Sequence, residues 1–406
     1  MMDPNVLFKA ALGLVPPWEV VGVEFSSQEK RLDIVIDFPA GSLFCCPRCG
    51  AEGCKAYDTQ KERWRHLDFF QYAAYLHARV PRVQCTKGCG VSKVEVPWAR
   101  PGSGFSLLFE ALMMTLVKEM PVATVAGLVG EHDTRLWRVV HHYVNAARAH
   151  VNMADVTQVG MDETACRRGH DYISLFFDLD RKRLLFGTPG KDQATVQAFV
   201  SDLKAHQGDP AQVTEACCDM SPAFIAGVEE QLPSAAITFD RFHVMKLMNE
   251  AVDQVRREEG KREPVLKKTR YIWLKNPKNL TSKQQQTLQG LPTHHLKTAR
   301  AYQIRLTLQE FFTQPDREAG AAFLKRWYFW ATHSRLQPVV NTAKTIKRHW
   351  DGLLNWFDSQ LTTGFIEGIN SLIQAAKARA RGYRTTENFI AMAYLIAGKL
   401  DFRLPT

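Results

Sequence analysis

The sequence contains no hydrophobic run long enough to cross a membrane. A membrane-spanning helix needs roughly 20 consecutive apolar residues, and no stretch of this chain approaches that length. The first residues, MMDPNVLFKAALG, also lack the charged start and the cleavage pattern of a signal peptide. We therefore expect a protein that has no membrane partner and works in the cytoplasm.

Acidic residues are scarcer than basic ones. The 406 residues include 42 Asp and Glu against 52 Lys and Arg, which gives a net charge of +10 and a pI near 9.1. A basic surplus favours nucleic acid or an anionic surface as a partner and carries no information about the fold. Because many ribosomal, metabolic and structural proteins are equally basic, the charge alone decides nothing. The length allows two to four structural units and a sizeable core.

The cysteine pattern argues against a disulfide framework. Nine is an odd count, six of the nine fall between positions 45 and 89, and no feature of the chain suggests secretion. The reducing cytoplasm is the better setting for these thiols.

Four of the cysteines have the spacing of a zinc site. Cys46 and Cys49 form a C-x2-C pair in CCPRCG, and Cys85 and Cys89 form a C-x3-C pair in CTKGCG. Two such pairs on either side of a strand-rich segment predict a zinc ribbon, in which four thiolates hold structural Zn²⁺ and leave no open position. The spare thiols at 45 and 54 could replace a ligand, so the set stays open. Buried structural cysteines are the alternative.

The segment between the two cysteine pairs alternates basic and aromatic residues. It reads TQKERWRHLDFFQYAAYLHARVPRV and contains Arg63 and Arg65. Side chains two positions apart share a strand face, so these arginines are candidates for contact with the DNA backbone. An ordinary strand face is the alternative. Upstream, residues 19–25 and 31–38 are expected to form a β-hairpin.

Residues 97–152 have the outline of a helix-turn-helix. After a linker we expect an apolar helix at 105–119, a short helix at 121–129, and a longer helix at 134–150 with Asp133 as its N-cap.

The longer helix separates into two faces. The inner face is expected to pack through Leu136, Val139, Val140 and Tyr143. The outer face is expected to enter a major groove of DNA through Thr134, Arg135, Arg138 and His142. A plain helical connector would match the same pattern, because the motif is easily met by chance.

The second half of the chain opens with alternating strands and helices. Residues 159–180 predict a strand that ends at Asp162-Glu163, a polar turn, and a buried strand at 172–178. Further strands are expected at 184–187, 213–219 and 236–239, with helices at 193–206 and 222–231. This order is that of a ribonuclease-H-like α/β core, in which the first and fourth strands are neighbours. Asp162 and Asp219 would then lie at adjacent strand ends.

The pattern turns helical and strongly basic from residue 243 to about 361. A solvated cationic face over a tryptophan-rich core is one reading, and a platform for DNA phosphates is the other. A tryptophan such as Trp273 could also stack on an unpaired base. The helix expected next, at 365–381, carries Glu367, and its spacing places three residues on the same face: Asn370, Gln374 and Arg381. Arg381 is also a candidate for contact with DNA.

Two aspartates on adjacent strands and a glutamate on a following helix meet the needs of a two-metal phosphoryl-transfer site. Mg²⁺ or Mn²⁺ would be held by Asp162, Asp219 and Glu367. One metal ion would activate the attacking water or hydroxyl, and the other would stabilise the leaving 3′ oxygen. Each acid taken singly is better explained as a cap or an ion-pair partner, so the prediction depends on their order in this topology.

The sequence resembles an insertion-sequence transposase of the ISL-three type, a branch of the DDE transposases. The resemblance covers nearly the whole chain and is carried by CPRCG with WRHLD, MDETACRRGHDY, CCDMSPAF, DRFHV, and TTGFIEGIN with ARARGYR. It implies cleavage of double-stranded DNA at the element's terminal repeats and strand transfer into target DNA. The DDE triad would correspond to Asp162, Asp219 and Glu367. Asp240 and His243 resemble a D-x2-H motif that would brace the site.

The resemblance also implies a homo-oligomer in the synaptic complex and association with the bacterial nucleoid when DNA is bound. The chain departs from the expected pattern in two places. The second cysteine pair is C-x3-C, and Gln374 stands where a lysine would suit the basic helix.

The sequence thus predicts a multidomain α+β and α/β protein. We expect a β-hairpin with a zinc ribbon in 1–96, a helix-turn-helix in 97–152, a ribonuclease-H-like catalytic core in 153–243 and 362–406, and an all-helical insertion in 244–361. A non-catalytic DNA-binding regulator derived from a transposase is the alternative function. A nuclease that cuts without joining is a weaker one.

Overall fold

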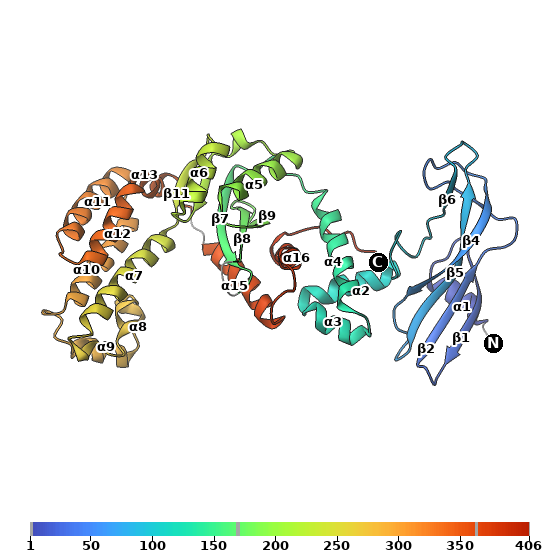
Figure 1. Cartoon of the computed structure of the whole chain (residues 1–406), viewed down its shortest axis with the longest axis horizontal. Helices are drawn as coiled ribbons and strands as arrows, with labels where there is room; N and C mark the ends of the chain where they lie inside the picture. Colours follow the sequence, from blue (N-terminus) through green and yellow to red (C-terminus); the bar gives the residue numbers. More distant parts are fainter. Residues whose placement is uncertain (1–2, 168–170, 362–363, 406) are drawn as a thin grey trace. The chain divides into compact units, whose positions relative to one another are not determined.

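The computed structural model describes residues 3–167, 171–361 and 364–405. The chain forms two compact units (Figure 1). The first extends to Tyr143 and also includes the end of the chain from Phe402, and the second comprises Val144–Asp401. Among the described residues, no helix combines the length and apolar character that crossing a membrane requires.

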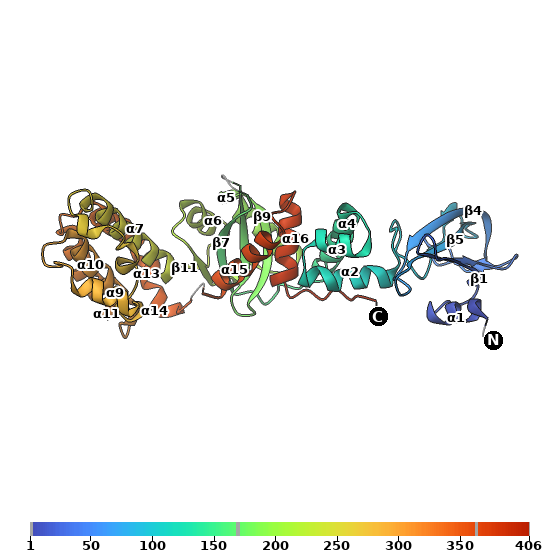
Figure 2. The same ribbon diagram turned by 90° about the horizontal axis from the view of Figure 1, so that it is seen from below.

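The first unit begins with a short helix and a six-stranded sheet. The strands pair in the order β1-β2-β5-β4-β3, and β6 pairs with β5. Helix α1 (Pro4–Ala11) contacts β1 on one face of the sheet (Figure 2). The hairpin predicted at 19–25 and 31–38 is confirmed. The six strands are β1 (Glu19–Ser26), β2 (Arg31–Asp37), β3 (Leu43–Phe44), β4 (Cys54–Arg65), β5 (Ala73–Gln84) and β6 (Val91–Lys93).

Three helices follow the sheet, and the first unit ends within the third of them. They are α2 (Leu107–Glu119), α3 (Val122–Val129) and α4 (Asp133–Arg148), and each lies within two residues of its predicted bounds. Gly130 ends α3 in the left-handed conformation, with φ of 67°, which produces the tight turn before α4. The predicted inner face of α4 is confirmed, since four of its side chains are buried: Leu136, Val139, Val140 and Tyr143.

The second unit is built on a five-stranded sheet with the order β11-β10-β7-β8-β9. Strand β10 runs parallel to both β7 and β11, whereas β7, β8 and β9 form antiparallel pairs. The first and fourth strands are therefore neighbours, as the sequence predicts. The strands are β7 (Gln158–Ala165), β8 (Tyr172–Asp178), β9 (Arg183–Pro189), β10 (Glu215–Cys218) and β11 (Ala236–Phe239).

Helices cover both faces of this sheet. Consecutive residues of β8 show the two sides, because Phe176 stacks on Phe199 of α5 (Gln193–Ala205) while Phe177 packs against Phe365 of α15 (Gly364–Arg379). Helix α6 (Pro222–Gln231) packs beside α5, and α16 (Thr386–Ala397) packs against α15 and β9.

The segment between β11 and α15 is helical, as predicted. Its α-helices are α7 (Arg241–Glu259), α8 (Arg270–Trp273), α9 (Ser282–Gln289), α10 (Lys297–Glu310), α11 (Arg317–Thr332), α12 (Gln337–Arg348), α13 (Trp350–Leu354) and α14 (Trp356–Ser359). Trp273 is 1% exposed, and its indole N–H donates to the Thr269 hydroxyl at 3.0 Å. The suggestion that it stacks on an unpaired base is therefore wrong, because its ring belongs to the core.

Several predicted element ends need correction. Strand β10 covers Glu215–Cys218 and not 213–219, so Asp219 lies just beyond it. Strand β7 does not end at the acidic pair but continues to Ala165, so Asp162 lies inside the strand. Helix α15 ends at Arg379, and Arg381 follows in a left-handed turn with φ of 56°, so it does not share the helical face of Glu367. Thr362 and Thr363, which begin the TTGFIEGIN motif, lie outside the described residues.

Candidate catalytic and DNA-binding sites

Three aspartates lie side by side across the parallel strands of the second unit, one inside β7 and one directly after each of β10 and β11. Cys217 of β10 pairs with Gly160 of β7, and continuing this parallel register by two residues places Asp219 level with Asp162. Asp240 follows β11 directly, and the register of β10 with β11 places it level with Asp219 on the other side. The topology thus brings together acids that lie 57 and 21 residues apart.

Helix α15 carries Glu367 to this row of aspartates. A side chain at Gly160 would collide with Ile366 of α15, at 2.4 Å from Cβ, so the missing side chain lets the helix approach the strand. The Asn370 amide Nδ2 donates to Asp162 Oδ2 at 2.5 Å. Ile366 and Asn370 lie on either side of Glu367 in α15. Glu367 is half-buried and interacts electrostatically with Asp162, Asp240 and His243.

The carboxylates of the site lie close enough together to raise one another's pKa. Burial raises the pKa of Asp162, and the negative charge of Asp219 raises it further. Burial and then the neighbouring Asp240 raise the pKa of Glu367. A positive partner stabilises the anionic form of partly buried carboxylates that lie this close together. Hard oxygen donors of this kind suit Mg²⁺ or Mn²⁺.

The D-x2-H pair predicted to brace the site lies beside it. Asp240 is 2% exposed and immediately precedes α7, which carries His243 one turn later. His243 Nδ1 lies 3.9 Å from Asp240 Oδ2, is buried, and makes no hydrogen bond with the described residues. The positive form of His243 would stabilise the charge of both Asp162 and Glu367.

A pocket next to the acids contains residues that sequence reasoning missed. Asp219 and His243 line it together with Glu163, Lys191 and Lys246. Burial raises the pKa of Glu163 to about 7. Lys246 lies three residues after His243 on α7, so helical spacing could have identified it. Lys191 follows β9 in a loop, where no spacing rule would single it out.

The structure brings the four predicted zinc ligands together. The sulfur atoms of Cys46, Cys49, Cys85 and Cys89 all lie within 4.8 Å of one another. Hydrogen bonds from the backbone N–H groups of Cys89 and Lys87 lower the pKa of Cys85 to about 6, which favours the thiolate that zinc binds. Of the six candidate zinc ligands, these four therefore form the cluster. Four cysteine sulfur atoms fit the tetrahedral coordination of Zn²⁺.

The two spare thiols lie elsewhere. Cys54 is fully buried and its thiol faces the Ala51 carbonyl oxygen at 3.4 Å, whereas Cys45 is exposed. Neither belongs to the cluster of four sulfur atoms.

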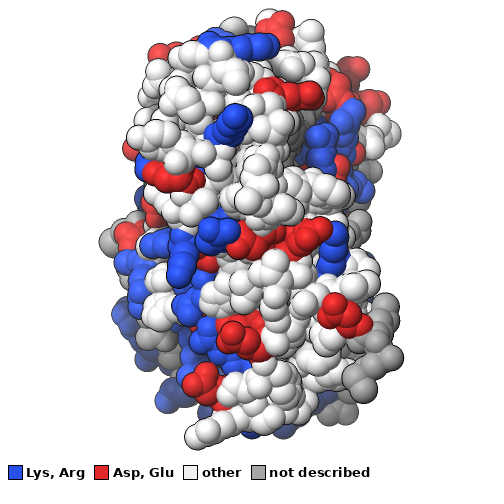
Figure 3. Space-filling view, turned by 90° about the vertical axis from the view of Figure 1, so that its right-hand side faces the viewer, with Lys and Arg blue, Asp and Glu red and all other residues white. Residues whose placement is uncertain are grey.

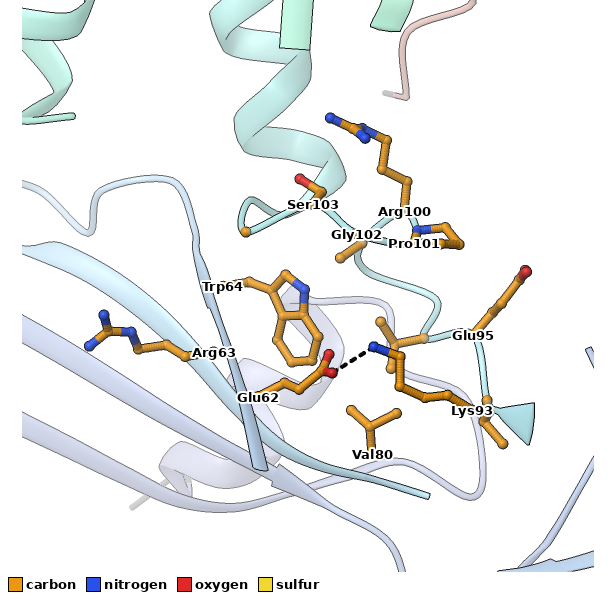
Figure 4. A pocket seen from close by; sticks show the side chains of 14 residues that line it. Glu62, Arg63, Trp64, Val80, Lys93, Glu95, Arg100, Pro101, Gly102 and Ser103 are labelled. Atoms are coloured by element: carbon orange, nitrogen blue, oxygen red, sulfur yellow. Dashed lines mark hydrogen bonds and ion pairs between the residues drawn. The ribbon is translucent and has the colours of Figure 1, made fainter. Parts of the chain in front are cut away.

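Arg63 and Arg65, predicted together as DNA contacts, have different environments. Arg63 is exposed and points away from Trp64, out of the neighbouring pocket (Figure 4). Arg65 is only 3% exposed. It donates to the carbonyl oxygens of His66 and Ala74 and forms an ion pair with Asp68. The prediction that Arg65 contacts DNA is wrong, because its donors are used inside the protein.

Helix α4 presents most of its predicted outer face. Thr134, Arg138 and His142 are exposed. Arg135 is partly engaged, because its guanidinium lies 4.2 Å from the Phe105 ring centroid and forms an ion pair with Glu131. Partial desolvation of the ring, and then the positive charge of Arg100, lower the pKa of His142. Arg381 is exposed in its turn beyond α15.

One face of the molecule carries a concentration of basic side chains. In the space-filling view, Lys and Arg gather along the lower left of this face, with some Asp and Glu side chains among them (Figure 3). A polyanion would find its favourable contacts in such a region.

Three family models match consecutive segments of the chain. Residues 42–89 match the zinc-finger of transposase IS204/IS1001/IS1096/IS1165, and residues 94–144 match the helix-turn-helix domain of transposase family ISL3. Residues 159–393 match the ISL3 family model described as a transposase.

Two curated relatives resemble the chain over almost their full length. One is the transposase for insertion sequence element IS1557 of Mycobacterium tuberculosis, 29% identical over 96% of this chain and 94% of the relative. The other is the transposase for insertion sequence element IS1001 of Bordetella parapertussis, 27% identical over 96% of this chain and 97% of the relative. The chain belongs to the ISL3 family of transposases.

Proposed function

We propose that this transposase binds the terminal inverted repeats of its insertion sequence and cleaves and joins DNA strands with Asp162, Asp219 and Glu367. The observation that carries the proposal is the parallel register that sets Asp219 level with Asp162. Glu367 joins them because α15 packs on β7 through Ile366 and Asn370.

The arrangement of the sheet supports a ribonuclease-H-like core. Three antiparallel strands are followed by two parallel strands on the far side of the first one. We assign 153–243 and 362–406 to this core and 244–361 to a helical insertion between Asp240 and Glu367. The zinc ribbon (1–96) and the helix-turn-helix (97–152) are then the DNA-binding part. A homo-oligomer would bring two element ends together.

The residues present fit a pair of divalent cations. Mg²⁺ prefers a few carboxylate oxygens and completes its shell with water and phosphate oxygens, so three convergent carboxylates suffice. When bound, Mg²⁺ or Mn²⁺ would activate the attacking oxygen and stabilise the leaving one.

The protein's own contribution is to hold the three acids ready for the metal. A backbone N–H fixes one oxygen of Asp219, which accepts from Ser221 at 3.0 Å. The packing of α15 on β7 fixes the position of Glu367 relative to Asp162. Asp240 and His243 support the site from the next strand and from α7.

The alternative, a DNA-binding regulator without catalysis, has no need for three convergent, partly buried acids. A substitution separates the two functions. Asp162→Ala is expected to abolish cleavage of terminal-repeat DNA in Mg²⁺ while leaving binding to the same DNA nearly intact. Asp171→Ala is the matched control, because Asp171 is exposed and lies in the same part of the chain. Equal loss of binding and cleavage in Asp162→Ala would count against the assignment.

A further inference from the structure

Helix α15 follows β7 along one face of the strand. The contacts of Ile366, Asn370 and Gln374 fall on Gly160, Asp162 and Thr164 in turn. Eight helical residues rise about 12 Å and four strand residues rise about 13 Å, so helix and strand remain in step over this distance. Every fourth residue of the helix therefore meets every second residue of the strand.

Of the three α15 residues that contact β7 in this way, Asn370 is the one that reaches a proposed metal ligand. Its Nδ2 donates to Asp162 Oδ2 at 2.5 Å, while the backbone N–H of Glu163 donates to Asp162 Oδ1 at 2.8 Å. Both carboxylate oxygens are thus held by donors. Each still has a further lone pair available for a metal ion.

The other amide atom of Asn370 is unusual. Its Oδ1 is buried and accepts no hydrogen bond from any described residue. A buried acceptor without a partner costs about 1–3 kcal/mol, so it is expected where a ligand supplies the missing donor. A water molecule in the shell of a bound cation is such a donor.

We propose that Asn370 is a positioning residue of the metal site, which orients the Asp162 carboxylate through Nδ2 and offers Oδ1 to the water shell of the cation. This inference rests on the proposed function. It adds a neutral residue to the three acids and gives α15 a second task besides carrying Glu367. Outer partners of metal ligands typically change metal affinity 10- to 100-fold when they are removed.

Gln374 provides a matched control on the same helix. Its Nε2 donates to Thr164 Oγ1 at 2.7 Å and to the Ala165 carbonyl oxygen at 3.1 Å. It therefore anchors α15 to β7 as Asn370 does, and these bonds do not involve Asp162. A purely structural role for Asn370 would make the two residues equivalent.

The experiment compares wild type, Asn370→Ala and Gln374→Ala in full-length protein, with two readouts. The first is the Mn²⁺ concentration that gives half of the maximal cleavage rate on terminal-repeat DNA. The second is the Mn²⁺ concentration that gives half of the maximal rise in thermal midpoint, measured without DNA. We expect both concentrations to rise about 10-fold or more in Asn370→Ala and to remain near wild type in Gln374→Ala.

Equal metal dependence in all three proteins would overturn the inference, even if both variants were less stable. A variant that fails to fold would be recognised by the loss of terminal-repeat binding, and Asn370→Ser would then replace it with a smaller perturbation. If wild type itself neither cleaves DNA nor responds to Mn²⁺, the proposed function fails, and this outcome differs from a failure that concerns Asn370 alone.

Discussion

Asp219 directly follows the last residue of β10, and the parallel pairing of β10 with β7 places it level with Asp162. Backbone pairing alone brings these carboxylates together. The same register extends to Asp240 beyond β11, so four acids surround the site when Glu367 is included. This crowding raises the question of which acids bind metal and which support them.

Substitutions of the two neighbouring aspartates should separate their roles. Asp219→Asn is expected to abolish cleavage, because it removes a ligand charge. Asp240→Asn is expected to slow cleavage about 10- to 100-fold, as for a residue that acts on metal ligands from outside. Single-turnover cleavage of terminal-repeat DNA measures both effects. Complete loss in Asp240→Asn with residual activity in Asp219→Asn would exchange the two assignments.

The four-cysteine cluster should bind one zinc ion that the first unit needs for its fold. Cys49→Ser is expected to lose zinc and to expose the β4–β5 region to proteolysis, because metal binding contributes directly to folding in such sites. Cys54→Ser is the matched control, since its thiol bonds to Ala51 and lies outside the cluster. Elemental analysis of the purified proteins measures zinc. Zinc loss in Cys54→Ser with retention in Cys49→Ser would refute the ligand set.

Arg63 and Arg65 should differ in what they affect. Arg63→Ala is expected to weaken DNA binding and to reduce the slope of log affinity against log salt by about 1, as for one phosphate contact. Arg65→Ala is expected to destabilise the first unit by about 1–3 kcal/mol, because it removes the buried guanidinium that donates to the carbonyl oxygens of His66 and Ala74. Salt-dependent binding and denaturant unfolding measure the two effects. An Arg65→Ala protein of unchanged stability would contradict this account.

His66 should make the stability of the first unit depend on pH. Burial, and then the charge of Arg65, lower the pKa of His66 to about 4 from 6.5, and its Nδ1 lies 2.8 Å from the Ser106 hydroxyl. The folded state therefore binds this proton less readily than the unfolded state. The free energy of unfolding contributed by His66 is therefore fully present above pH 6.5. It falls by up to about 3 kcal/mol as the pH falls toward 4.

His66→Asn should remove this contribution while keeping a hydrogen-bond partner for Ser106. Denaturant unfolding at several pH values compares the two proteins, and acidic groups common to both cancel in the difference. Parallel curves for wild type and His66→Asn would show that His66 does not titrate in this range.

The local sequence predicted helices and strands well where the burial and the hydrophobic periodicity of a segment indicate the same type of element. The strands at 172–178 and 236–239 have the predicted bounds, and the cysteine pairs converge because their spacing reflects the geometry of the metal. The adjacency of the first and fourth strands followed from the order of elements. These features are local, or follow from the order alone.

Sequence reasoning failed where a side chain's environment depends on distant residues. Arg65 matches an exposed basic strand position, yet the segment around Gly104 and Ser106 covers it through backbone hydrogen bonds. Gln374 occupies a position where the sequence suggested a lysine. In the structure its side-chain amide donates to Thr164 Oγ1 of β7, far away in the sequence. The neutral pairing of Asn370 with Asp162 joins residues 208 positions apart, which no local pattern reveals.

The central claim is that Asp162, Asp219 and Glu367 form one metal-dependent catalytic site. The most direct test incubates the element's own end DNA with Mg²⁺ or Mn²⁺ and compares wild type with Glu367→Gln, which keeps the size of the side chain and removes its charge. We predict nicking at the element end by wild type only, with equal DNA binding by both proteins. Nicking by Glu367→Gln at the wild-type rate, or specific binding without nicking by either protein, would contradict the account.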